Sequence, residues 1–172
     1  MLNIGECVIY GNHGLCKVRE ILVPSFLERG NEKQYYMMVS AVDAGSTLYV
    51  PVDGAEDKVR EVMSADDAEG LIDDIFEVEE LDLPDGKKAE PTISEIVKRN
   101  IADEMMSLVK SLHKIKATRE AEGKKFAALD EKYLNIAEKL LYTEMAFALK
   151  TEKDDIKRRV IDELSQLPLE TA

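Results

Sequence analysis

The sequence predicts an α+β protein in two parts, a small β-module followed by an all-α antiparallel helical bundle. Two observations predict this order. Short runs of β-branched and aromatic residues, separated by turn residues, occupy the first third of the chain. Beyond them, apolar residues recur at the three- and four-residue steps of amphipathic helices. With 172 residues, the chain can bury one moderate core or two small ones, so we expect two domains.

The β-module is predicted to hold five short strands, and we assign it to residues 1–63. The strands are predicted at residues 8–10, 15–21, 35–39, 47–52 and 59–62. Five strands in about 60 residues predict a strongly bent sheet or a small barrel, which must be closed or supported to be stable.

The run 47–52 is predicted to be an edge strand. Its alternation places Leu48, Val50 and Val52 on one face. Pro51 has no backbone N–H, so it cannot donate a hydrogen bond to a neighbouring strand, which is tolerated at the edge of a sheet. Because an edge strand leaves backbone groups unpaired, this one could accept a strand from a partner protein.

Residues 64–91 are predicted to form a short capped helix and an acidic linker. Ser64 with Asp67 is a capping pattern. The apolar positions of the helix that follows are Leu71, Ile72, Ile75 and Phe76. The run 83–91 contains proline and glycine and predicts a linker, with a domain boundary between residues 80 and 91.

The bundle is assigned to residues 92–172 and is predicted to begin with one long helix. Thr92 and Glu95 form a capping-box pattern, and an apolar stripe at helical spacing runs from Ile93 to Ile115. Asp130 is expected to open a second helix. A third helix is expected to be capped by Thr151 with Asp154 and stopped by Pro168. The short connections imply an antiparallel arrangement.

Charge is unevenly distributed along the chain, whose net charge is −12. Residues 53–85 hold fourteen acids against two bases and so carry the whole imbalance. Residues 98–125 hold eight bases against four acids, a net of +4. A basic surface can therefore exist on this acidic protein.

The chain offers no constellation of residues that predicts catalysis. His13 lies in a predicted turn and His113 on the polar side of its helix, and neither has a partner that would make it a base. The acids of residues 53–85 lack the glycine-spaced loop of a calcium site, and no phosphate-cradling glycine loop is present. We expect no enzyme, no cofactor and no metal.

The two cysteines, Cys7 and Cys16, flank a predicted turn and could face each other across a hairpin. We expect them to be reduced, half-buried small hydrophobes rather than a disulfide or a metal site.

No apolar run approaches the roughly 20 residues that span a bilayer, and the N-terminus has neither the basic flank nor the apolar region of a signal peptide. We therefore expect a cytoplasmic protein.

Three short segments of the β-module form a recognisable set: Gly5-Glu6-Cys7-Val8-Ile9-Tyr10, His13-Gly14 and Tyr49-Val50-Pro51-Val52. Together they resemble the RNA-polymerase-interacting module shared by the bacterial regulators CarD and CdnL and by the transcription-repair coupling factor. The helical half resembles the late helices of CarD and CdnL through Asp130-Glu131-Lys132, Leu134, Ala137, Leu140, Leu141 and Glu144. The likeness covers nearly the full chain in order, and a free-standing chain is closer to CarD or CdnL than to the coupling factor.

The resemblance implies a Tudor-like barrel that docks on the β subunit of RNA polymerase by pairing edge strands. The polymerase-binding residues are then expected to be Thr47, Leu48, Tyr49, Val50 and Pro51. The protein would be associated with the nucleoid through RNA polymerase.

The resemblance also implies that the helical domain contacts promoter DNA at the upstream edge of the melted region, where a tryptophan near the start of its first helix wedges into the minor groove. This chain has no tryptophan, and Ile93 occupies the matching position. Two positions that are arginine in some relatives are Glu95 and Ile96 in this chain. The basic residues that remain in this stretch are Lys98 and Arg99. Ile93 is either an apolar wedge or, in register with the helical stripe, a core residue.

Further phosphate contacts are expected from the later bases: Lys114, Lys116, Arg119, Lys124 and Lys125. Such contacts give weak, salt-sensitive binding without sequence readout. The predicted function is a regulator that modulates the stability of the open promoter complex. The alternative is a polymerase-bound protein–protein adaptor whose helical domain does not touch DNA, which the lost tryptophan and Glu95 favour.

Overall fold

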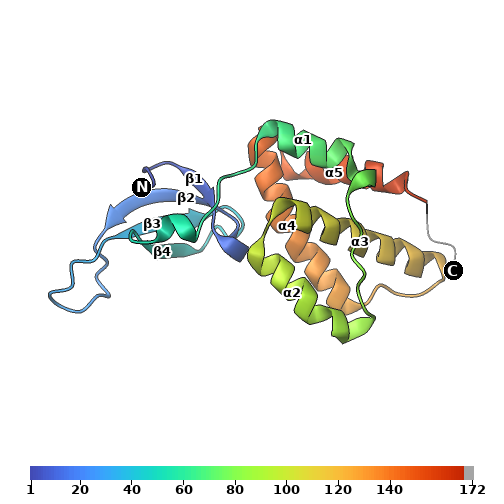
Figure 1. Cartoon of the computed structure of the whole chain (residues 1–172), viewed down its shortest axis with the longest axis horizontal. Helices are drawn as coiled ribbons and strands as arrows, with labels where there is room; N and C mark the ends of the chain where they lie inside the picture. The colour runs from blue at the N-terminus through green and yellow to red at the C-terminus, as the bar shows by residue number, and fades with distance from the viewer. Residues whose placement is uncertain (169–172) are drawn as a thin grey trace. The chain divides into compact units, whose positions relative to one another are not determined.

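The computed structural model describes residues 1–168 and shows an α+β protein of two compact units, the first being Met1–Val62 and the second beginning at Met63 (Figure 1). The first unit is an open antiparallel sheet and the second holds five α-helices, so the predicted fold class is confirmed. The domain limits expected at 63/64 and 91/92 stay predictions.

The sheet of the first unit has the strand order β1-β2-β3-β4. Its strands are β1 (Cys7–Ile9), β2 (Leu15–Leu22), β3 (Tyr35–Ser40) and β4 (Thr47–Pro51). The register of β2 with β3 shifts between Val18 and Glu20, an irregularity of the kind that bends a strand. One face of the sheet buries Val18, Tyr36, Met38 and Val50, as the alternation of each strand requires.

The fifth predicted strand, at residues 59–62, is not formed. Arg60 makes a single bridge to Ile9, with N–H to C=O distances of 2.9 Å in both directions. The bridge is isolated, so the pairing does not continue along β1 to the neighbours of Arg60. The module is therefore the open, bent form of the predicted sheet, supported at one point of its β1 edge.

The two cysteines do not face each other across the hairpin. Cys7 is paired with Lys17 and Cys16 with Val8, so successive residues direct the two thiols to opposite faces of the sheet. Both cysteines are free, and burial raises the pKa of the Cys16 thiol to about 11. Cys16 therefore behaves as a small core hydrophobe, as expected.

The helices of the second unit are α1 (Ala65–Asp73), α2 (Glu90–Arg99), α3 (Ala102–Ala121), α4 (Ala128–Leu149) and α5 (Lys153–Ser165). Ser64 caps α1 by accepting a hydrogen bond from the Asp67 N–H at 3.0 Å, which confirms that prediction. α4 packs against α1, α3 and α5, so it is the central helix of the bundle (Figure 1).

The long helix predicted from Thr92 to Ile115 is broken in two. Asn100 adopts a left-handed conformation with φ of 46° and ends α2, because asparagine tolerates this region better than most residues. Ile101, which the stripe placed inside, is 44% exposed as a result. The apolar spacing alone did not reveal the break.

Three predicted helix starts were displaced by a few residues. α2 begins at Glu90 with Pro91 in its first turn, so the Thr92–Glu95 capping box does not mark its start. α4 begins at Ala128, two residues before Asp130. α5 has Glu152 as its N-cap, and Thr151 Oγ1 instead donates to Asp155 Oδ2 at 2.6 Å.

Candidate functional sites

The outer edge of β4 carries backbone groups that no strand of the described chain pairs. Val52 N–H donates to Gln34 C=O at 3.1 Å, and Ser40 N–H donates to Ser46 C=O at 3.4 Å. Hydrogen-bonded pairs alternate in an antiparallel ladder, so the even-numbered residues of β4 bond to β3. Thr47 and Tyr49 therefore direct N–H and C=O groups outward, and Pro51 directs only a carbonyl.

Three aromatic rings lie beside this edge and form what we call the aromatic face: Phe26, Tyr35 and Tyr49. Phe26 meets Tyr49 edge to face at 5.3 Å between ring centroids, and meets Tyr35 at 5.8 Å. Phe26 is 61% exposed and Tyr49 is 42% exposed. Exposed aromatics that pack on each other in this way resemble the anchors of protein–protein interfaces.

Sequence reasoning identified Tyr49 but missed Phe26 and Tyr35. Phe26 lies in the connection between β2 and β3, where no strand or helix period reveals which way a ring points. The signal in the sequence was that Phe26 is the one aromatic residue of this connection, residues 23–34. Of the remaining predicted polymerase-binding residues, Leu48 and Val50 contribute to the core, so they position the strand rather than offer side chains to a partner.

Ile93, the candidate DNA wedge, is completely buried with Ile96 and Val97 on the inner face of α2. A side chain in this position cannot reach a base step while α2 stays packed. Of the two roles left open by the sequence, burial favours the core role.

The bases at the end of α2 differ in their surroundings. Arg99 Nε lies 3.0 Å from Glu104 Oε2, and Arg99 Nη1 lies 3.7 Å from Glu95 Oε2. Two glutamates therefore already balance the charge of this arginine. Lys98 is exposed as well.

The bases around the end of α3 are brought together by the turn that follows it. Arg119 Nε donates to the Lys125 carbonyl at 2.6 Å, and Lys124 pairs with Glu122 at 3.3 Å. Lys116 lies over the Phe126 ring at 5.9 Å. We call Lys116, Arg119, Lys124 and Lys125 the turn cluster. With 20 residues, α3 is about 30 Å long, so the turn cluster and Lys98 do not form one patch.

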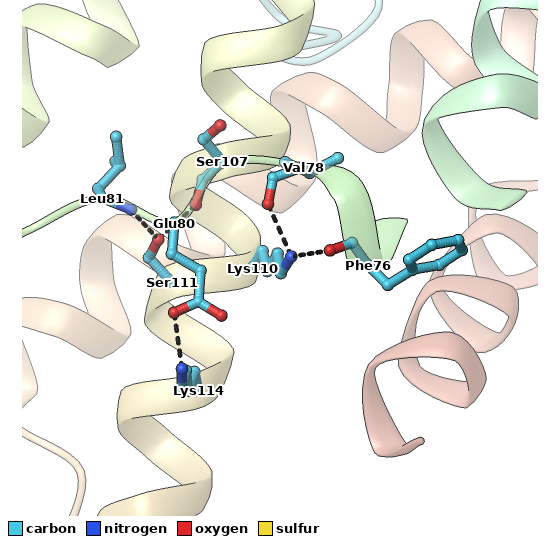
Figure 2. A network of polar contacts seen from close by, with 8 residues as sticks. All are labelled: Phe76, Val78, Glu80, Leu81, Ser107, Lys110, Ser111 and Lys114. Atoms are coloured by element: carbon cyan, nitrogen blue, oxygen red, sulfur yellow. Dashed lines mark hydrogen bonds and ion pairs between the residues drawn. The ribbon is translucent and has the colours of Figure 1, made fainter. Parts of the chain in front are cut away.

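Lys110 and Lys114 make intramolecular contacts with the segment between α1 and α2 (Figure 2). Lys110 is only 3% exposed, and its Nζ donates to the carbonyls of Phe76 at 3.1 Å and Val78 at 2.7 Å. Burial lowers the pKa of this lysine. Lys114 Nζ lies 2.6 Å from Glu80 Oε2.

His113 is not the solvated helix residue that we expected. Its Nε2 lies 3.3 Å from Glu138 Oε2, and both side chains are largely buried. Burial would raise the pKa of Glu138, but the hydrogen bond and charge of His113 bring it below its ordinary value. This pair links α3 to α4.

Within residues 1–168, no group of three or more His, Cys, Asp or Glu side chains is placed to hold a metal ion. None of the helices in the same range has the length and apolar character needed to cross a membrane.

Residues 2–63 match the family described as the CarD-like/TRCF RID domain. No curated protein matches the chain. The family match ends where the sheet unit ends, so the resemblance of the helical unit to CarD and CdnL stays a prediction.

Proposed function

Residues 2–63 form a CarD-like/TRCF RID domain, and from this premise we propose that the chain is a non-enzymatic transcription regulator that docks on the β subunit of RNA polymerase. The observation that carries the proposal is the outer edge of β4, where Thr47 and Tyr49 direct unpaired backbone groups outward. A strand of the β subunit would pair with these groups and extend the sheet.

Specificity for the β subunit would come from the aromatic face. Backbone pairing supplies affinity without distinguishing sequences, so side chains next to the edge must select the partner. Phe26, Tyr35 and Tyr49 offer rigid rings that lose little conformational freedom on binding. Pro51 has no N–H to offer, which limits the paired stretch to the residues before it.

The helical unit is proposed to contact promoter DNA weakly at the upstream edge of the melted region. With Ile93 buried, the contact rests on cations, namely Lys98 and the turn cluster. A preference of 1.4 kcal/mol for the open complex changes its population tenfold, which a few phosphate contacts can supply. Docking on polymerase raises the local concentration of DNA, so low intrinsic affinity is sufficient.

A second function, a polymerase-bound adaptor that does not touch DNA, is favoured by specific observations. Ile93 is unavailable as a wedge, and Arg99 is paired with two glutamates. The helical unit also exposes large apolar side chains, Phe76 and Phe147 among them, which a protein partner could cover.

The lifetime of an open promoter complex distinguishes the two functions. It is measured with saturating wild-type protein, with Lys98→Glu, with Lys124→Glu/Lys125→Glu, and with Tyr49→Asp. The control Lys139→Glu changes an exposed lysine on α4 that belongs to neither cationic group. Tyr10→Asp is the tyrosine control for Tyr49→Asp, since Tyr10 follows β1 at the opposite end of the strand order.

The regulator hypothesis predicts that the wild type changes the lifetime and that both lysine variants reduce the change, whereas Lys139→Glu does not. A response that persists in every lysine variant and is lost only with Tyr49→Asp would support the adaptor. No response to the wild type at saturation would refute both.

A further inference from the structure

The segment that joins α1 to α2 crosses α3 and is held there by hydrogen bonds (Figure 2). At its near end, the buried Lys110 ammonium bonds to the carbonyls of Phe76 and Val78. Further along, the Leu81 N–H donates to Ser111 Oγ at 2.9 Å, and the same hydroxyl donates to Ser107 C=O at 2.7 Å. These contacts fix the path of the segment over one face of α3.

The far part of this segment, residues 79–85, contains four carboxylates and no base: Glu79, Glu80, Asp82 and Asp85. We call it the acidic strap. Glu80 pairs with Lys114, and Asp82 and Asp85 line one groove together with Lys114 and Arg119. The strap thus places three of its four carboxylates, those of Glu80, Asp82 and Asp85, beside Lys114 and Arg119 of α3.

We propose that the acidic strap is an autoinhibitory contact. It occupies the surface of α3 around Lys114 and Arg119 in place of DNA phosphates, and it is displaced when DNA binds there. A carboxylate on Lys114 uses the same N–H donors that a phosphate oxygen would use. This inference rests on the proposed contact of the helical unit with DNA.

The near and far ends of the segment differ in how readily they can be released. Lys110 is buried, and its ammonium group bonds to two backbone carbonyls. Separating the segment from Lys110 would leave the ammonium group and both carbonyls without these hydrogen bonds, which costs free energy. The Lys114–Glu80 pair is different, because its side chains are 22% and 39% exposed. Exposed ion pairs contribute little to stability and are screened by salt. In the proposed displacement, Lys110 therefore stays bonded to the segment, and the strap beyond it moves away from α3. A phosphate then takes the place of the Glu80 carboxylate on Lys114.

The affinity for a short fluorescent duplex DNA, measured by anisotropy over a series of salt concentrations, tests the inference with the full-length chain. The strap variant is Glu80→Gln/Asp82→Asn/Asp85→Asn. The matched control is Asp53→Asn/Asp57→Asn/Glu61→Gln, which makes the same change of net charge at exposed positions of the sheet unit. The single variant Glu80→Gln repeats the test with the smallest structural change.

The inference predicts that the strap variant binds DNA about threefold to tenfold more tightly than the matched control, with a steeper salt dependence by about one phosphate contact. Adding Lys114→Gln to the strap variant should remove most of this gain. Equal affinities of the strap variant and the matched control would overturn the inference. In that case, weaker binding by Lys124→Glu/Lys125→Glu would show that the proposed DNA contact survives. If even the strap variant fails to bind DNA at low salt, both proposals fall.

Hydrogen exchange of the wild-type protein gives a second readout that net charge does not influence. The Leu81 amide is bonded to Ser111 Oγ, so displacement of the strap removes its protection. Saturating DNA should accelerate exchange at Leu81 while amides in the middle of α4 keep their rates. An unchanged rate at Leu81 in the DNA complex would contradict displacement.

Discussion

The basic residues between 98 and 125 have different roles that depend on what surrounds each one. Lys110 is buried and bonded to two carbonyls, whereas Lys98 is exposed at the end of α2. Arg99 and Lys114 each contact glutamates. A count of charge along the sequence treats these residues as equivalent, so it overstates the cationic surface that a nucleic acid can reach.

Lys110→Met tests the anchoring role at the near end of the connecting segment. Methionine fills similar space but leaves the carbonyls of Phe76 and Val78 without this donor, so we expect a loss of about 1–3 kcal/mol of unfolding free energy. Urea unfolding measures the loss. Lys116→Met is the control and should cost about 0.5 kcal/mol or less, because Lys116 is partly exposed. Equal effects of the two substitutions would contradict the anchoring role.

The His113–Glu138 pair predicts a specific pH dependence of stability. Because the pKa of Glu138 is below its ordinary value of 4.5 in the folded chain, its carboxylate stabilises the fold above that pH. This contribution disappears as the pH falls through the lowered pKa. The advantage of the wild type over Glu138→Gln in urea midpoint should therefore shrink as the pH is taken below 4.5. A difference that stays constant with pH would refute this role.

The helices and strands show which features local sequence patterns can predict. The edge position of β4 followed from alternation and Pro51, and the cap of α1 followed from Ser64 and Asp67. These features depend on residues that are near one another in the chain. Other contacts join residues that only the tertiary structure brings together. Examples are the bond between Lys110 and the segment 76–78 and the packing of Phe26 on Tyr49. No periodicity of a single element contains that information.

The break between α2 and α3 is an element-scale feature that depends on one residue. Asn100 has φ of 46°, where a Cβ-bearing residue such as alanine costs roughly 1–2 kcal/mol more than glycine. We therefore expect Asn100→Ala to be less stable than Asn100→Gly by about 1 kcal/mol in urea unfolding. The comparison between the two variants cancels the loss of the asparagine side chain. An alanine variant as stable as the glycine variant would show that the left-handed turn is not maintained.

The whole molecule combines a sheet unit whose edge strand β4 is open with a helical unit in which 26 acids outnumber 17 bases. The net charge of −12 disfavours free association with DNA, and the acidic strap adds a local source of that effect. Docking on RNA polymerase would overcome it by raising the local DNA concentration. On this account, promoter contact depends on docking, so the β4 edge is the central element.

The most direct test of this claim is the affinity of the isolated polymerase β subunit for Thr47→Pro and Thr47→Val. The Thr47 N–H points away from β3, so proline removes an outward donor without removing a bond of the sheet. Valine removes the hydroxyl and keeps the donor. Thermal unfolding of both variants verifies the fold. We predict that Thr47→Pro weakens binding about tenfold and that Thr47→Val stays within about twofold of the wild type. Wild-type affinity of a folded Thr47→Pro protein would contradict docking through this edge.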